Sequence, residues 1–134
     1  MIDNIIHFIF GLKKQTEEFL FCYYLSVFSA FIVNNPEKIY FYYHYLPYGK
    51  WWIKLKKIAC IEFIKIDLPT KFGEKKIIKY AHKADKIRMD VLYKKGGIYM
   101  DIDTISYMPY KHLLNNEVVL GIEISADKHP DRIC

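Results

Sequence analysis

The chain alternates between short apolar runs and longer amphipathic stretches, the pattern of strands separated by helices. Three apolar runs predict strands, at residues 5–10, 38–44 and 61–66. Residues 16–33 predict a helix with Thr16 as its N-cap, and residues 50–57 predict a shorter helix. Strands joined by helices indicate an α/β fold with a mostly parallel sheet flanked by helices.

The second half of the chain continues this alternation. A loop at residues 69–73 precedes the clearest helix, residues 75–95, which Gly96-Gly97 ends. Strands are expected beyond it at residues 98–101 and 105–108, with a strand pair or one bent strand at 118–124.

The helix predicted at residues 75–95 has one apolar face, formed by Ile77, Ile78, Ala81, Ala84, Val91 and Leu92. Asp85 and Arg88 break this pattern, because both fall inside the apolar arc. Burying charged groups is costly unless they are paired or hold something polar. The two residues are therefore either a private salt bridge between helix and sheet, or a carboxylate and a guanidinium that bind hydroxyls or phosphate in a cleft.

Composition is that of a folded domain. The 134 residues are 52% hydrophobic and 26% charged, which excludes a disordered chain and fits one domain. The net charge of +5 suits an anionic partner, but the lysines are spread along the sequence. A nucleic-acid footprint is usually denser, so nucleic-acid binding is not expected.

The cysteines bear on a disulfide or zinc site, and the uncharged segment 19–33 bears on a membrane span. Three widely spaced cysteines argue against a disulfide framework or a zinc site. A membrane span needs about 20 apolar residues, so this shorter segment predicts a buried core helix, with a membrane anchor as the lesser alternative. The N-terminus has no signal-peptide pattern. A soluble or peripheral protein is expected, in a compartment that the sequence does not specify.

The sequence Asp101-Ile102-Asp103 is the strongest candidate for chemistry. In an extended chain both carboxylates would point to one side, while Ile102 would face the core. Two clustered carboxylates repel each other, and a hard cation such as Mg²⁺ or Mn²⁺ relieves that repulsion. The pair also follows a predicted strand, where ligands of α/β sheets gather. A lone D-x-D is a weak signal, but the preceding Asp85, Arg88 and double glycine make it specific.

Residues 81–104, AHKADKIRMDVLYKKGGIYMDIDT, resemble the D-x-D sugar-binding region of glycosyltransferase family 32-like enzymes and a segment of the clostridial glucosylating toxins. Residues 5–11 are similar to that family's first strand, and residues 47–52 and 68–70 to its linking region. The resemblance implies a single GT-A-like, Rossmann-related donor-binding domain over residues 1–134. Members are usually longer, so the chain is expected to lack the family's C-terminal side.

The resemblance also implies roles for individual residues. Asp85 and Arg88 match positions that hold the hexose hydroxyls of the donor. Asp101 matches the first motif carboxylate, near ribose, sugar and metal, and Asp103 matches the second, which ligates Mn²⁺ or Mg²⁺.

Two aromatic residues are expected to contact the nucleotide. Tyr99 matches an aromatic residue beside it, and Phe10 stands where the family usually has a tryptophan that stacks on uracil. Phenylalanine can stack with less area and no indole N–H. His7, on the same predicted strand, is expected to be a hydrogen-bonded core residue.

The implied activity is metal-dependent transfer of a hexose from a nucleoside-diphosphate sugar, with a UDP-hexose expected, to an unknown glycan, lipid or protein acceptor. The sequence offers no candidate catalytic base or nucleophile beyond the motif. The alternative is therefore a catalytically incomplete remnant that binds nucleotide sugar or metal, or acts as an interaction module. A basic nucleic-acid-binding domain is a third reading, which the dispersed charge disfavours.

Overall fold

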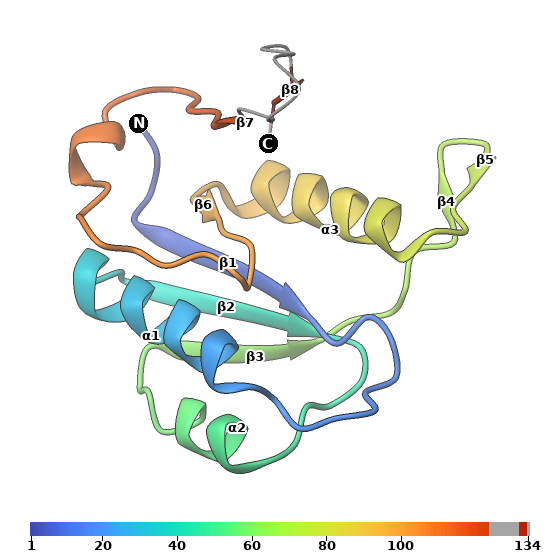
Figure 1. Ribbon diagram of the computed structural model, residues 1–134. Helices are drawn as coiled ribbons and strands as arrows, with labels where there is room; N and C mark the ends of the chain where they lie inside the picture. Colours follow the sequence, from blue (N-terminus) through green and yellow to red (C-terminus); the bar gives the residue numbers. More distant parts are fainter. Residues whose placement is uncertain (124–131, 134) are drawn as a thin grey trace.

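Side chains of the central strands are apolar on both faces, and the strands form a parallel sheet covered by helices on each side (Figure 1). The computed structural model describes residues 1–123 and 132–133. The sheet has the order β3-β2-β1-β6, with β1 at Ile5–Phe10, β2 at Lys38–Tyr43, β3 at Ile61–Lys65 and β6 at Ile98–Tyr99. This confirms the predicted α/β class and its parallel sheet.

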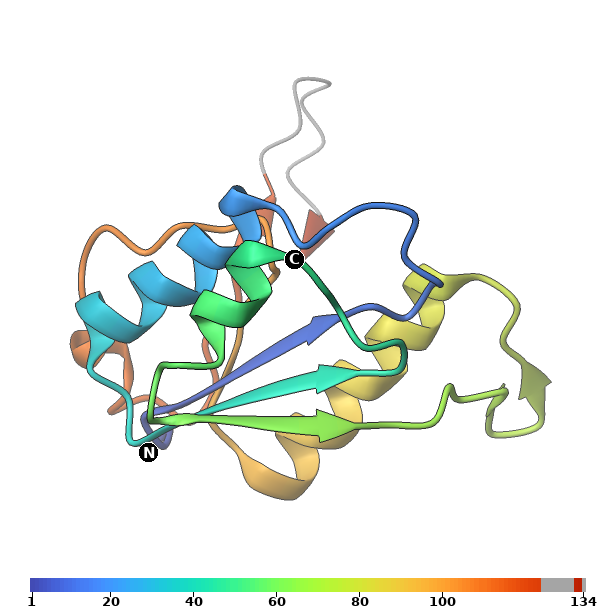
Figure 2. The same ribbon diagram turned by 90° about the horizontal axis from the view of Figure 1, so that it is seen from below.

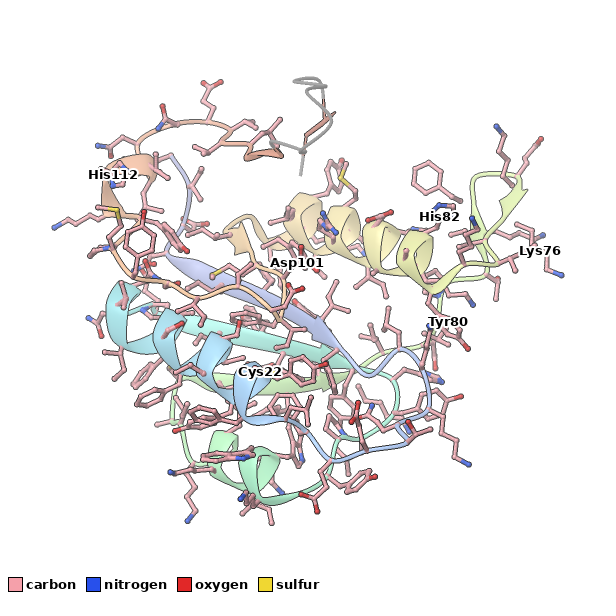
Figure 3. The ribbon with its side chains drawn as sticks, in the orientation of Figure 1. Cys22, Lys76, Tyr80, His82, Asp101 and His112 are labelled. Carbon is pink, nitrogen blue, oxygen red and sulfur yellow. The ribbon has the colours of Figure 1, made fainter. Side chains whose placement is uncertain are left out.

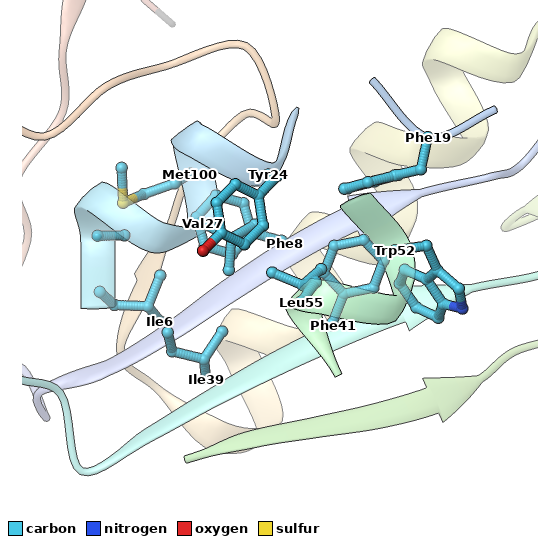
Figure 4. Close-up of a cluster of buried hydrophobic side chains, with 11 residues drawn as sticks. Ile6, Phe8, Phe19, Tyr24, Val27, Ile39, Phe41, Trp52, Leu55 and Met100 are labelled. Carbon is cyan, nitrogen blue, oxygen red and sulfur yellow. The ribbon is translucent and has the colours of Figure 1, made fainter. Parts of the chain in front are cut away.

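Two hydrophobic clusters hold the layers together. Ile6 and Phe8 of β1 point to the face covered by α1 (Phe21–Asn34) and α2 (Lys50–Leu55), where they pack in the larger cluster (Figure 4). Ile9, the next residue along the strand, points to the opposite face and packs with Ile87 of α3 (Tyr80–Lys95). Figure 2 shows α1 and α2 on one side of the sheet and α3 on the other. Because side chains alternate between the two faces of a strand, β1 contributes residues to both hydrophobic clusters.

Helix α1 begins at Phe21, so the prediction of Thr16 as its N-cap is wrong. Leu20 is the N-cap and makes no side-chain capping bond. The physical reason is Phe19, which is buried in the core and whose N–H donates to the carbonyl of Tyr48 at 2.8 Å. The chain therefore reaches α1 in a non-helical conformation.

The predicted buried helix at residues 19–33 is confirmed in part. Tyr24, Val27 and Ala30 of α1 are buried, while Phe21 and Ile32 are exposed. Among residues 1–123 and 132–133, the structure contains no helix long and apolar enough to cross a membrane.

Helix α3 begins at Tyr80, five residues later than predicted. Lys75–Lys76 form strand β5, which pairs with β4 (Lys71–Phe72) in a hairpin where a loop was expected. Ile77 and Ile78 precede the helix, and Ile78 is exposed, so their assignment to its apolar face is wrong. The N–H of Ile77 donates to Thr70 at 2.8 Å, which closes the hairpin instead.

The strand predicted at residues 105–108 is absent from the described chain. This segment runs along α1, where the N–H of Ser106 donates to Ser29 Oγ at 3.1 Å and the N–H of Tyr110 donates to Asn34 Oδ1 at 2.9 Å. Polar side chains of α1 thus satisfy backbone groups that a strand would have paired with the sheet.

The C-terminal part contains a short 3₁₀ helix at Lys111–Leu113 and a small antiparallel pair. Strand β7 (Ile122–Glu123) pairs with β8 (Arg132–Ile133). Of the strand pair or bent strand predicted at 118–124, only Ile122–Glu123 is a strand, and its partner lies outside the predicted range. Residue 124 lies outside the described residues.

The close approach between Gly97 and β1 predicts a large effect of substitution. A Cβ at Gly97 would lie 2.5 Å from the carbonyl oxygen of Ile5, whereas a Cβ at Gly73 would meet nothing within 4 Å. Both glycines have positive φ, so Gly73→Ala measures the conformational cost alone, about 1 kcal/mol. Gly97→Ala should lower the free energy of unfolding by about 1–3 kcal/mol more, because the clash adds to it. Equal losses in urea unfolding would contradict the proposed close packing.

Candidate functional site

The order of the sheet reverses beside β1, and this fixes where a ligand can bind. The chain proceeds from β1 to β2 and β3 on one side, then returns to place β6 on the other side of β1. In open α/β sheets, ligands bind at the carboxyl ends of the strands where the order reverses. Phe10 ends β1, and Asp101 follows β6 by two residues. Phe10 and Asp101 therefore lie at or just beyond the carboxyl ends of β1 and β6.

A cavity of about 570 Å³ opens at the end of β1. Its wall is formed mainly by residues 9–18, with Tyr23 of α1 and Ala84 of α3. Phe10 lines the cavity, and its ring centroid lies 5.0 Å from those of Phe19 and Tyr23. The Phe10 ring is thus both part of the core and part of the cavity wall, held in orientation by its aromatic neighbours.

Arg88 of α3 connects the other predicted residues. Its Nη2 atom lies 3.2 Å from Asp85 Oδ1 and 3.9 Å from Asp101 Oδ1. Its guanidinium carbon lies 4.4 Å from the centroid of the Tyr99 ring. The Tyr99 hydroxyl donates a hydrogen bond of 2.8 Å to the same Asp101 oxygen. Four residues from α3 and the end of β6 thereby form one cluster, with Asp101 labelled in Figure 3.

The exposure of this cluster bears on the two interpretations of Asp85 and Arg88, which do form an ion pair with each other. The Arg88 side chain is 28% exposed, but that of Asp85 is 57% and that of Asp101 55% exposed. A private buried salt bridge would hide both partners. Here both carboxylates keep much of their surface open, while Arg88 is held between them, which favours a polar surface able to accept a ligand.

The environment of Tyr99 keeps it a hydrogen-bond donor. Burial raises the pKa of its hydroxyl well above the usual range, and the hydrogen bond and charge of Asp101 raise it further. Arg88 opposes the shift, with a smaller effect. Tyr99 is therefore protonated at any physiological pH, and it orients Asp101 by donating to it.

The D-x-D segment has a different backbone shape from the one predicted. Strand β6 ends at Tyr99, and residues 101–104 form a turn in which the N–H and Oγ1 of Thr104 donate to the Asp101 carbonyl at 3.2 and 2.7 Å. The argument that extended chain turns both carboxylates to one side is therefore wrong. The turn forms because the chain leaves the sheet here to cross α1. Ile102 still packs against the larger core, as predicted.

The Asp103 side chain is exposed and forms no hydrogen bond or ion pair within the described residues. Burial has the larger effect in raising the pKa of the Tyr23 hydroxyl, and the charge of Asp103 helps to raise it further. Asp101 and Asp103 thus have different surroundings: the first is engaged by Arg88 and Tyr99, and the second is open to solvent.

Two comparisons relate this site to known proteins. A family model described as the glycosyltransferase sugar-binding region containing a DXD motif matches residues 16–120. The chain belongs to this glycosyltransferase family. It is also 33% identical over 144 residues to Glucan organizing enzyme 1 of Cryptococcus neoformans var. grubii serotype A, an alignment that covers 100% of this chain and 39% of that protein. The chain therefore spans about two fifths of the length of this curated relative. No solved structure matches the chain.

Membership of the glycosyltransferase family agrees with the observed fold. A parallel sheet with helices on both faces is consistent with the GT-A-like, Rossmann-related architecture that the resemblance implies. The matched region includes Asp85, Arg88, Tyr99, Asp101 and Asp103, whereas Phe10 precedes it.

His7 is a core residue, as predicted. It is fully buried, its Nε2–H donates to the carbonyl of Gly96 at 2.8 Å, and its Nδ1 accepts from the Tyr42 hydroxyl at 3.2 Å. Burial lowers the pKa of the imidazole, which stays neutral. Its hydrogen bond to Gly96 holds the Gly96-Gly97 corner, from which β6 starts, against β1.

The sequence analysis missed the loop that follows β1. Lys13, Lys14 and Gln15 line the cavity beside Phe10, and Tyr23 joins them from α1. Ligand-binding residues of α/β proteins often lie in the loops after the strands. The position of this loop, directly after the first predicted strand, was the signal that could have identified it.

The Asp85 and Asp101 side chains of the Arg88 cluster are more than half exposed. The cluster is therefore expected to contribute little to the free energy of unfolding. Arg88→Met should change the free energy of unfolding by less than about 1 kcal/mol, because the largely exposed ion pairs are worth little and Met suits a helix. Lys86→Met is the matched control, since it removes the neighbouring Lys86–Asp90 pair on the same helix. Thermal melts compare the two variants. A collapse for Arg88→Met alone would indicate a structural salt bridge.

Proposed function

We propose that this chain binds a nucleoside-diphosphate hexose, with a UDP-hexose as the expected donor, and serves in metal-dependent transfer of the hexose. The observation that carries the proposal is the Arg88 cluster at the exit from β6, next to the cavity that Phe10 lines. Family membership supports the sugar-binding role of this region. The acceptor, a glycan, a lipid or a protein, is left open.

The cluster offers hydrogen-bonding groups that suit a sugar. A hexose hydroxyl both donates and accepts hydrogen bonds. The half-exposed carboxylates of Asp85 and Asp101 would accept from hydroxyls, and the Arg88 guanidinium would donate to them. Because Arg88 and Tyr99 already orient Asp101, the site would lose little side-chain freedom when a sugar binds.

The cavity at the end of β1 is suited to the base. Phe10 would stack on the uracil ring, with Tyr23 and the loop of residues 11–18 around it. Lys13 and Lys14 in that loop would add positive charge close to a diphosphate. The cavity and the Arg88 cluster would therefore hold the two ends of one donor molecule.

Asp101 and Asp103 are suited to a hard divalent cation, Mn²⁺ or Mg²⁺. The described residues contain no group of three or more His, Cys, Asp or Glu side chains that could hold a metal. Two carboxylates still fit such a cation, since Mg²⁺-type sites often use one or two carboxylates together with substrate phosphates and water. Asp103 is the more open ligand, because Tyr99 and Arg88 engage Asp101. When bound, the cation would supply Lewis-acid stabilisation of the charge on the departing diphosphate.

The chain's own residues would bind and orient the donor. Arg88 and Asp85 would fix the hexose, Phe10 would fix the base, and Asp101 would hold the sugar end of the nucleotide next to them. No residue is assigned here as a catalytic base or nucleophile. Binding of the donor without turnover would identify the alternative, a catalytically incomplete relative.

The first test of this function is the metal dependence of donor binding. UDP-glucose and UDP-galactose titrated by calorimetry should bind in the presence of Mn²⁺, and EDTA should abolish most of the affinity because the two carboxylates otherwise repel the diphosphate. Adding excess Mn²⁺ after EDTA is the control and should restore binding. An affinity that EDTA leaves unchanged would refute the metal-dependent donor site.

The second test concerns the base. Phe10→Ala should weaken UDP binding by about 1–3 kcal/mol, the usual contribution of a stacked aromatic side chain. Phe10→Trp, which restores the residue usual in this position of the family, should bind at least as tightly as the parent. Both variants must first be shown to be folded by circular dichroism. If folded Phe10→Ala binds UDP as the parent does, Phe10 is only a core residue.

A further inference from the structure

A second surface lies between the β4–β5 hairpin and α3, and it meets the proposed donor site at Asp85. The hairpin extends beyond the sheet beside the start of α3 (Figure 1), and Figure 3 shows Lys76 on the hairpin and His82 on the helix. A groove of about 390 Å³ separates the two elements. We call it the hairpin groove, and define it by Phe72, Lys75, Lys76, His82, Lys86 and Met89, with Ile77 and the Asp85 carboxylate completing its lining.

The hairpin groove is built from a stretch of the sequence in which positive charge is concentrated. Residues 71–86 include six lysines and only two acidic residues, Glu74 and Asp85, so this stretch has a net charge of +4 in a chain of net +5. Three of these lysines, Lys75, Lys76 and Lys86, line the groove itself. Lys86 is paired with Asp90, whereas Lys75 and Lys76 form no ion pair within the part of the chain that the structure describes.

Apolar side chains are exposed beside these lysines. Phe72 on the hairpin is 62% exposed and Met89 on α3 is 63% exposed, and both line the groove. Ile77 lies buried beneath them. The Nζ atom of Lys86 lies 5.9 Å from the centroid of the Phe72 ring, so cation and aromatic ring share one surface. Lysines next to exposed aromatic and aliphatic groups are typical of surfaces that lie in the membrane interface.

We propose that the hairpin groove docks on an anionic phospholipid surface. Lys75 and Lys76 would contact the headgroup phosphates, while Phe72 and Met89 would enter the boundary between headgroups and acyl chains. A nucleic-acid groove would instead carry a row of large aromatic rings for base stacking, whereas Phe72 and the imidazole of His82 are the aromatic rings in the described lining of this groove. This docking does not require the glycosyl transfer proposed above, although the two sites share Asp85.

The test measures partitioning of the full chain onto vesicles. The parent should sediment with vesicles of phosphatidylcholine containing about a third phosphatidylserine, but not with phosphatidylcholine alone, and rising salt should release it. Lys75→Gln/Lys76→Gln should lower the partition coefficient on the order of 30-fold, because each surface lysine contributes about fivefold. The matched control, Lys56→Gln/Lys57→Gln, removes the same charge from two exposed lysines after α2, on the other side of the sheet, and should change it by less than about twofold.

A second pair of variants tests the apolar contribution. Phe72→Ser should weaken vesicle binding several-fold, whereas Ile53→Ser, which removes a comparably exposed apolar residue from α2, should not. Equal binding to neutral vesicles, or equal losses in the two lysine pairs, would overturn the proposal. A further outcome would overturn the proposal in favour of nucleic acid. In that outcome the chain binds a single-stranded oligonucleotide through Lys75 and Lys76, and Phe72→Ser leaves vesicle binding unaffected.

Discussion

The contact between the Gly96-Gly97 corner and β1 is the constraint on which the rest of the structure depends. Gly97 lies against the carbonyl of Ile5, the Gly96 carbonyl accepts a hydrogen bond from His7, and the N–H of Met100 donates to His7 at 3.0 Å. These contacts hold β6 next to β1, on the side opposite to β2. The reversal of strand order that results brings the helix before the corner and the D-x-D segment after it to the end of β1.

Much of the fold could be predicted because the central strands obey a simple rule. Their residues alternate between two covered faces, so runs such as 5–10 and 38–44 are mostly apolar or aromatic and easily recognised. The errors lie where one tertiary contact overrides the local pattern. Phe19 inserts into the core and delays α1, the hairpin uses residues assigned to α3, and side chains of α1 take the backbone groups of residues 105–108.

For the candidate site, the sequence identified residue types but not their geometry. The chemistry of Asp85, Arg88 and the two motif aspartates was readable from their spacing and from the family they resemble. The turn at residues 101–104 was not, because it follows from the path of the chain over α1. The contributions of Tyr23 and Ala84 to the cavity, and the pairing of the hairpin with α3 in the hairpin groove, also required the fold, since they join separate elements. The expectation that the lysines are spread along the chain overlooked residues 71–86, which carry a net charge of +4.

The central claim is that the two carboxylates at the exit from β6 hold a cation together with the donor. It is tested most directly by Mn²⁺ titrations and thermal melts of three variants within the motif. Asp103→Asn should lower Mn²⁺ affinity at least about tenfold and leave the melting temperature unchanged, because it removes one charge from an exposed ligand. Asp101→Asn should weaken donor binding as well, and should retain part of the metal affinity. Ile102→Asn should have the reverse effect of Asp103→Asn: it should keep the Mn²⁺ affinity but destabilise the domain by about 1–3 kcal/mol, because it places an amide against the core. If Asp103→Asn binds Mn²⁺ as tightly as the parent, the metal-binding role of the motif is wrong, and the proposed donor site loses its main physical support.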